Sequence, residues 1–318
     1  MKLFLVFIIN ILLFQNVIFA QCCGAGNPIS VSTSDNTIEA KKMKVGLNYR
    51  FSFSDTYYEE MHKTTLEFPT ALKNSNYNYL NLNIGYGITK RLSAFISLGY
   101  YINKTETFKS ELFGKLNGSG IGDLDLSISY KAYVNSRKGI ELAPYFNVKF
   151  PVGKFDCEDN GIKLPISLQP SSGSFRYSGG IYFYTNLPKR FFITSFNIFE
   201  YAQRIKSYNF NYKYGNTLFL SLDANYKAVE SLIFGIQASY EYKSRSKREN
   251  NQVLFGTGYQ TISLTPHITF IAKKNTFFSL LVDIPVFHKV EEIQLVNKFA
   301  LQLKINHNMD FNKKCSTK

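Results

Sequence analysis

Histidine and hydroxyl side chains are the first groups in this sequence that could perform chemistry, because together they can supply a nucleophile and its base. The four histidines are His62, His267, His288 and His307. His267 and Thr269 stand two residues apart, which would place both on one face of a strand. A lipid-hydrolysing enzyme would need such a pair and a third, orienting group. Because the sequence contains neither Gly-x-Ser-x-Gly nor His-x-Ser, we predict no catalytic residues and no enzyme activity.

Cysteines are too scattered to indicate a metal centre or a disulfide framework. Cys22 and Cys23 are adjacent near the N-terminus, whereas Cys157 and Cys315 lie far along the chain. Adjacent thiols could bind a soft metal or become oxidised. No histidine or further cysteine lies near them to complete a site, so an exposed tail is the simpler interpretation. We therefore predict no metal and no cofactor.

Charged side chains form the larger set of candidates. The chain has 37 Lys+Arg and 23 Asp+Glu, a formal net charge of +14. This excess is spread over turns and loops without a recognised nucleic-acid motif, so no nucleic-acid partner is expected. Charges of both signs also stand on the polar faces of alternating segments, at Asp125, Lys131, Glu141, Lys149, Arg176, Asp223, Lys227, Glu241, His267, Asp283 and Lys304. Such a set could line a selective passage or close it as a salt-bridge network.

Strict alternation of apolar and polar residues predicts the strands that position these side chains. In residues 42–54, for example, Met43, Val45 and Leu47 alternate with Lys44, Gly46 and Asn48. Similar segments are 77–89, 92–101, 124–134, 140–151, 174–186, 191–203, 217–228, 232–243, 259–271, 276–287 and 298–311. Most of these strands are roughly 10–14 residues long, whereas globular strands average about 5–6 and tilted membrane strands need about 9–11. Strand length therefore favours a membrane.

The connections between these segments alternate between long and short. The long connections are 55–76, 102–123, 152–173, 204–216, 244–258 and 288–297, and the short ones are 90–91, 136–139, 187–190, 229–231 and 272–275. Lipid offers no partner to backbone groups, so a sheet in lipid must close on itself. The sequence predicts an all-β, twelve-stranded antiparallel up-and-down transmembrane β-barrel with long external loops and tight periplasmic turns. A secreted β-sandwich is the soluble alternative.

Aromatic residues near the strand ends are expected to form the interfacial girdles of this barrel. They are Tyr49, Tyr100, Tyr101, Tyr130, Tyr240, Tyr242, Phe287 and Phe311. Basic pairs mark several short turns, among them Lys90-Arg91 and Lys189-Arg190, and could meet anionic lipid head groups. Outer-membrane lipids are therefore expected partners.

The N-terminal sequence predicts export. Lys2 precedes a long apolar run that ends at Ala20, which is typical of a secretory signal peptide. The expected organisation is a signal peptide at 1–20, an N-terminal periplasmic segment at 21–40, an outer-membrane barrel at 41–311 and a C-terminal tail at 312–318. The predicted location is the outer membrane of a Gram-negative-type bacterium.

A motif around the fourth predicted strand resembles a known family. Residues 120–153 read GIGDLDLSISYKAYVNSRKGIELAPYFNVKFPVG, in which Gly120, Gly122, Asp123, Tyr130, Lys131, Pro151 and Gly153 carry the resemblance. They are similar to the outer-membrane transporter barrels of the meta-pathway phenol-degradation type, although Val152 stands where that family often has Thr. The resemblance implies a barrel that admits hydrophobic or aromatic compounds. Loop-forming roles for Asp123, Pro151 and Gly153 remain the alternative.

These patterns together predict a passive outer-membrane channel or uptake transporter for small solutes, hydrophobic or aromatic ones included. A non-conducting adhesion, binding or structural barrel is the first alternative. A membrane lipid-modifying enzyme is the second. The patterns leave the solute and the oligomeric state undetermined, together with whether the lumen is plugged.

Overall fold

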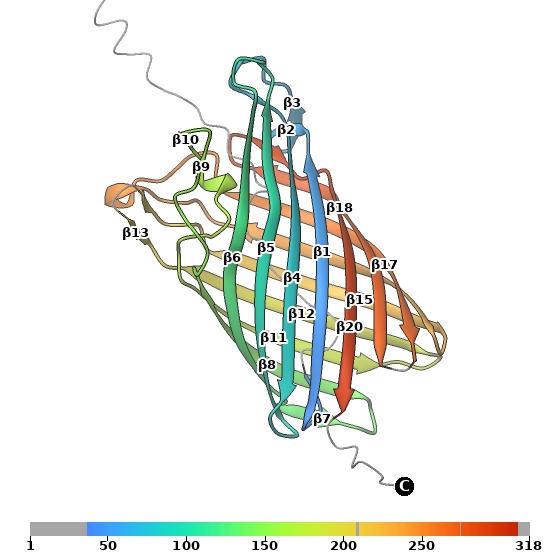
Figure 1. Ribbon diagram of the computed structural model, residues 1–318. Helices are drawn as coiled ribbons and strands as arrows, with labels where there is room; N and C mark the ends of the chain where they lie inside the picture. The colour runs from blue at the N-terminus through green and yellow to red at the C-terminus, as the bar shows by residue number, and fades with distance from the viewer. Residues whose placement is uncertain (1–36, 208–209, 274, 311–318) are drawn as a thin grey trace, which may run out of the picture.

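The computed structural model describes residues 37–207, 210–273 and 275–310, which form a closed barrel of twelve antiparallel strands (Figure 1). The barrel strands are β1 (Lys42–Ser54), β4 (Leu72–Gly87), β5 (Leu92–Phe108), β6 (Lys115–Tyr130), β8 (Ile140–Phe150), β11 (Arg176–Asn186), β12 (Phe191–Ala202), β15 (Thr217–Val229), β16 (Leu232–Lys243), β17 (Tyr259–Ala272), β18 (Thr276–Val290) and β20 (Phe299–Asp310). Each strand pairs with its neighbour along the chain, and β20 pairs with β1 from Lys42↔Asp310 to Phe53↔Phe299. The predicted fold class is confirmed.

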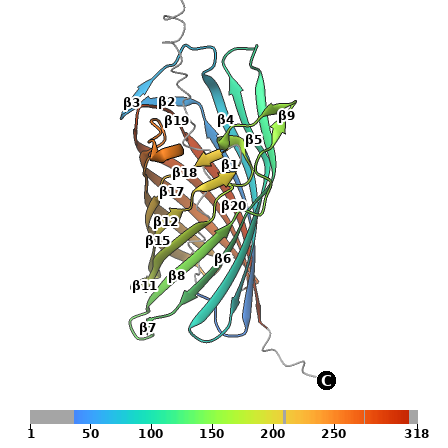
Figure 2. The same ribbon diagram turned by 90° about the vertical axis from the view of Figure 1, so that its left-hand side faces the viewer.

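Short turns and long loops lie at opposite ends of the barrel (Figures 1 and 2). Small elements decorate the long-loop end. They are the sheet of β2 (Thr56–Glu59), β3 (His62–Thr64) and β19 (Ile293–Val296), the hairpins β9 (Glu158–Asp159) with β10 (Ile162–Lys163) and β13 (Ile205–Ser207) with β14 (Phe210–Tyr212), and the 3-10 turns η2 (Ile166–Leu168) and η3 (Glu249–Asn251). At the other end, β7 (Tyr133–Asn135) pairs with β8. In outer-membrane barrels the short turns face the periplasm.

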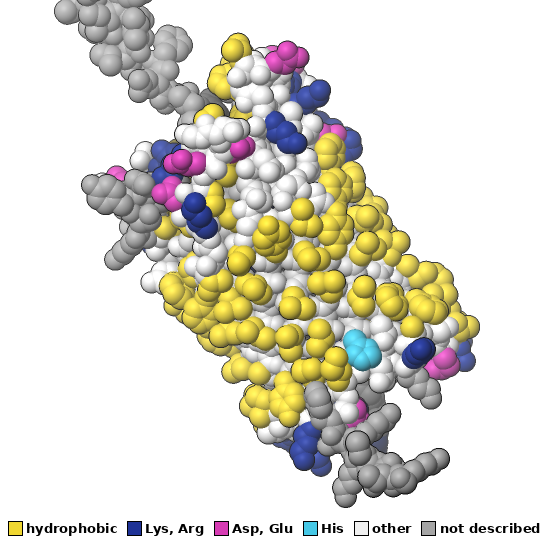
Figure 3. Space-filling model, in the orientation of Figure 1, with side chains coloured by type: hydrophobic (Ala, Val, Ile, Leu, Met, Phe, Trp, Pro, Cys, Tyr) yellow, Lys and Arg dark blue, Asp and Glu magenta, His cyan; other side chains and the backbone are white. Residues whose placement is uncertain are grey.

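The two faces of the barrel wall differ sharply in polarity, as period-two alternation requires. Apolar side chains cover the outer surface as a broad belt (Figure 3). They include Leu47, Leu82, Ile96, Ile128, Phe146, Ile181, Phe199, Leu222, Phe234, Ile236, Phe270, Phe278 and Leu303, all exposed. The inner face is mostly polar and buried, with Lys44, Ser93, Asp125, Lys149, Arg176, Glu200, Asp223, Gln237, Thr265 and Asn306 among its members. Such a wall suits a lipid exterior and a polar interior.

Three strands extend further than the alternation predicted. β4, β5 and β6 continue beyond the rest of the barrel, and the predicted loop 102–123 is wrong because the turn spans only residues 109–114. The extensions are mostly polar, with isolated apolar residues such as Ile102 and Ile121, so they show no sustained apolar alternation to detect. Bulges between Leu98 and Tyr100 and between Tyr101 and Lys104 shift the β5–β6 register. Tyr101 follows Ser93, Ser97 and Gly99 on the inward-facing side of β5, so it points inward at 1% exposure and is not part of a girdle.

The chain reaches β1 from inside the barrel. The Ile38 backbone N–H donates to the Ser93 hydroxyl at 2.9 Å, and Thr37 donates to the Glu141 carboxylate. Residues 37–40 therefore lie within the short-turn mouth. The predicted signal peptide, most of segment 21–40, Phe311 and the tail 312–318 lie outside the described residues. Among those described, no helix has the length and apolar character needed to cross a membrane.

Candidate functional site

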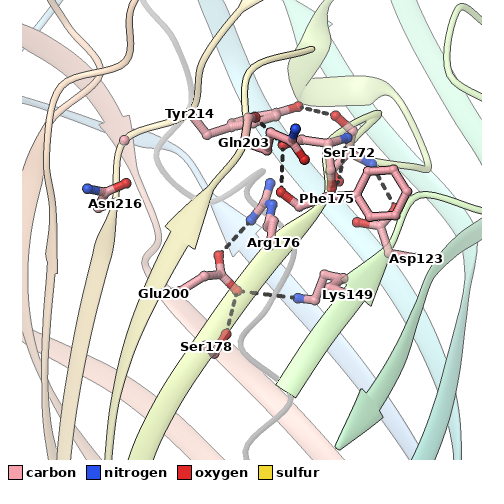
Figure 4. A network of polar contacts seen from close by, with 12 residues as sticks. Asp123, Lys149, Ser172, Phe175, Arg176, Ser178, Glu200, Gln203, Tyr214 and Asn216 are labelled. Atoms are coloured by element: carbon pink, nitrogen blue, oxygen red, sulfur yellow. Dashed lines mark hydrogen bonds and ion pairs between the residues drawn. The ribbon is translucent and has the colours of Figure 1, made fainter. Parts of the chain in front are cut away.

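A buried ion-pair network lies on the inner wall formed by β6, β8, β11 and β12 (Figure 4). Glu200 accepts a hydrogen bond from Arg176 at 3.0 Å and lies 3.8 Å from the Lys149 ammonium. Lys149 is also 3.8 Å from Asp125, which accepts a hydrogen bond from Asn147 at 3.1 Å. These five side chains come from four neighbouring strands, all in inward positions of the antiparallel register. Each buried charge has an opposite charge nearby, as a polar barrel interior requires.

The long loop at residues 152–175 folds against the inner wall beside this network. Asp123 on β6 accepts hydrogen bonds from the Ser171 hydroxyl at 2.7 Å and the Ser172 backbone N–H at 3.0 Å. The Lys104 ammonium donates to the Gln169 carbonyl at 2.9 Å, and Ser167 donates to Glu106 at 2.8 Å. Ser171 and Gln169 are 1% exposed. The loop therefore narrows the lumen at the long-loop end.

The long loop between β12 and β15, which contains Tyr214, contacts the same part of loop 152–175. The Tyr214 hydroxyl donates to the Ser172 carbonyl at 3.0 Å, and the Arg176 guanidinium stacks over the Tyr214 ring at 4.5 Å (Figure 4). Burial raises the pKa of Tyr214 well above its ordinary value. The tyrosine therefore stays a neutral hydrogen-bond donor and links the loop to the ion-pair network.

Glycines in the motif and just before it make room for loop 152–175. A Cβ atom at Gly118 would come within 2.1 Å of the Leu168 carbonyl oxygen, and one at Gly120, where φ is +139°, would be 3.3 Å from Pro170. At Gly153 a Cβ would come 1.8 Å from the Ile121 carbonyl oxygen. Close backbone approach explains why glycine serves at these points.

The remaining motif residues are dispersed. Gly122 lies beside the backbone carbonyl groups of Gly99 and Pro170, Pro151 follows the end of β8, and Tyr130 is exposed on the outer surface. Lys131 instead forms an ion pair with Glu141 at 3.5 Å near the short-turn mouth. The motif positions therefore do not form one site, although Gly120, Gly122 and Asp123 together hold the inward loop.

The other predicted lumen residues fall into separate clusters. Asp283 pairs with Arg50 at 3.1 Å, and Glu241 accepts from the Tyr259 hydroxyl at 2.6 Å. Asp223 lies 2.9 Å from His267 Nε2. Lys227 pairs with Glu230 at 2.5 Å beside a short turn. Lys304 lies on the inner face of β20, opposite Asn48 in the register. The structure thus spreads the predicted set along the lumen.

Two groups of inner residues were missed from the sequence. Glu200 and Arg50 belong to ion pairs, and a charge inside a membrane-length strand was itself a signal that the residue faces inward. An apolar inner cluster of Ala143, Tyr182, Phe196 and Ile198 also lines β8, β11 and β12. Its presence on the inner face weakens the alternation of β12, which concealed Glu200.

His267 and Thr269, the pair singled out in the sequence, do not contact each other. Within residues 37–207, 210–273 and 275–310, His267 hydrogen-bonds to Asp223 and to no hydroxyl group. Thr269 is paired with the Ser279 hydroxyl at 2.7 Å. The same part of the chain contains no group of three His, Cys, Asp or Glu side chains that could hold a metal ion.

Comparison with known proteins supports the architecture. No family model and no curated protein sequence matches this chain. Among solved structures, the COG4313 outer membrane channel from Pseudomonas putida F1 is similar with a TM-score of 0.68 and 14% identity, over 88% of this chain and 100% of that one. The transport unit of the autotransporter AIDA-I from Escherichia coli has a TM-score of 0.51 and 9% identity, over 88% of this chain and 94% of that one. At such identities the likeness shows the fold alone.

Proposed function

We propose that this protein is an outer-membrane channel or uptake transporter through which small solutes diffuse passively. The observation that carries the proposal is a closed barrel with an apolar exterior, a charged inner wall and an inward-folded loop. Charged side chains at a constriction set which solutes pass. The likeness in fold to an outer membrane channel supports this reading and the outer-membrane location. A solute class that includes hydrophobic or aromatic compounds rests on the sequence motif alone.

Planar-bilayer recording of the refolded mature protein tests the proposal, with heat-modifiable gel mobility as the check on folding. We expect stepwise conductance from the folded barrel. A folded protein that never conducts would refute a water-filled passage. The matched variants are Asp123→Ala, which releases the loop contacts at Ser171 and Ser172, and Glu249→Ala in an exposed loop. Asp123→Ala should raise the conductance or its fluctuations, whereas Glu249→Ala should leave both unchanged.

A non-conducting binding or structural barrel is the second candidate. The observation that favours it is the dense pairing of Lys149, Arg176 and Glu200, because a closed salt-bridge network can fill a narrow lumen. The same recordings separate the two functions. Silence from wild type together with silence from Asp123→Ala would favour the non-conducting barrel.

A further inference from the structure

The wall formed by β1 and β20 carries positive charge that the described residues do not fully neutralise. This wall lies opposite β11 and β12 in the order of strands around the barrel. Its inward cations are Lys44, Arg50 and Lys304. Arg50 is occupied, since its guanidinium pairs with Asp283 at 3.1 Å and donates to the Tyr77 hydroxyl at 3.2 Å. Lys304, unlike Arg50, has no such ion pair within the described part of the chain.

Lys304 makes no hydrogen bond or ion pair within residues 37–207, 210–273 and 275–310. It is half-buried on the inner face of the barrel. The charges that act on it are Arg50, Lys44 and Asp223, so two of the three repel it. Asp223 is held by His267 at 2.9 Å and receives a hydrogen bond from Thr194 at 3.5 Å. A half-buried ammonium without an acidic partner favours a mobile anion beside it.

The two residues directly opposite Lys304 on the neighbouring strands are polar but uncharged. Asn48 lies directly opposite on β1, and Ser279 lies opposite on β18. The Asn48 side-chain oxygen is buried and has no hydrogen-bond partner among the described residues. Directly opposed residues of antiparallel strands have Cβ atoms about 4.5–5.5 Å apart. An unpaired donor and an unpaired acceptor therefore belong to directly opposed residues of the inner wall.

We propose that Lys304 and Asn48 form a solute-binding site in the lumen for small hydroxylated carboxylates. The ammonium of Lys304 donates to the carboxylate, and the Asn48 oxygen accepts a hydrogen bond from a hydroxyl of the same molecule. Charge-assisted hydrogen bonds of this kind are about twice as strong as neutral ones. The proposal deepens the channel function and rests on it, because it names the solute class that the lumen selects.

Glycerate and glycerol are suitable probes, because they have the same three-carbon chain and differ in one carboxylate. We expect proteoliposomes with the full mature protein to admit glycerate several-fold faster than glycerol. Lys304→Gln should abolish this preference, and Lys304→Arg should retain most of it. Lys90→Gln removes the same charge from an exposed turn and should leave the preference unchanged. Heat-modifiable mobility confirms the folding of every variant.

Calorimetric titration of glycerate into the detergent-solubilised protein separates the two proposals. Binding that is lost in Lys304→Gln and weakened several-fold in Asn48→Ala supports the site, even if the barrel proves not to conduct. Conductance with an unchanged glycerate preference in Lys304→Gln would overturn the site and leave the channel standing. Absence of glycerate binding in wild type would overturn the site as well. After subtraction of the flux into protein-free liposomes, which neutral glycerol crosses unaided, a faster flux of glycerol than of glycerate would have the same consequence.

Discussion

Replacement of Glu200 by Gln should destabilise the barrel strongly, because two buried cations depend on this carboxylate. The Glu200 side chain is 7% exposed, and those of Arg176 and Lys149 are 6% exposed. At an effective dielectric of about 20, the 3.0 Å separation from Arg176 corresponds to about 5.5 kcal/mol of attraction. Desolvation of the charges offsets much of this in the intact pair. Loss of one partner leaves a buried charge uncompensated, which costs about 3–5 kcal/mol.

The free energy of unfolding is the quantity to measure, by guanidinium titration of protein refolded into lipid vesicles. The chain contains no Trp, so far-ultraviolet circular dichroism is the appropriate signal. With a denaturant slope of about 4 kcal/mol/M, Glu200→Gln should lower the unfolding midpoint by about 1 M. Glu249→Gln changes an exposed carboxylate and should have little effect.

A double-mutant cycle with Arg176→Met tests the pairing itself. Glu200→Gln combined with Arg176→Met should be less destabilised than the sum of the single variants, since Arg176 then no longer leaves an unpaired buried charge. A loss below about 1 kcal/mol for Glu200→Gln would refute the reasoning. Additive effects in the cycle would show that the two side chains are not energetically coupled.

Three further outcomes are expected. Gly118→Val should displace loop 152–175, because a Cβ there would come within 2.1 Å of the Leu168 carbonyl oxygen. Proteolysis of that loop should therefore be faster in Gly118→Val than in wild type. Gly179→Val is the control and should leave the rate of proteolysis unchanged, because the added Cβ meets open space. Burial would raise the pKa of Asp55, but hydrogen bonds from Lys298 and Thr56 lower it overall. Asp55 therefore stabilises the fold above about pH 4, and the stability difference between wild type and Asp55→Asn should disappear as the pH falls below that value. Phospholipid hydrolysis should stay at background in wild type; hydrolysis that His267→Ala abolished would contradict the absence of an enzyme function.

The motif around Gly120 shows how sequence and structure divide the information about the site. Sequence pattern identified Gly120, Gly122 and Asp123 as a unit, but not what the unit contacts. Only the tertiary structure shows that Asp123 accepts hydrogen bonds from Ser171 and Ser172, which lie far along the chain. The spacing of the motif follows from β6, whereas its partner depends on how a long loop folds back. Loop conformation has no periodic signal in the sequence.

The sequence by itself determined the barrel, because alternation of polarity follows directly from the pleat of a strand between lipid and a polar interior. It also placed Lys149, Arg176 and Asp223 on the inner face, since facing is set by parity within one strand. Only the tertiary structure decided which charges meet, because Glu200 and Lys149 come from strands that are not consecutive. It likewise decided the pairing along β5, where bulges shift the register with β6. Local alternation therefore specifies which side chains face the lipid and which face the lumen. The register of many strands specifies which of the inward charges pair with one another.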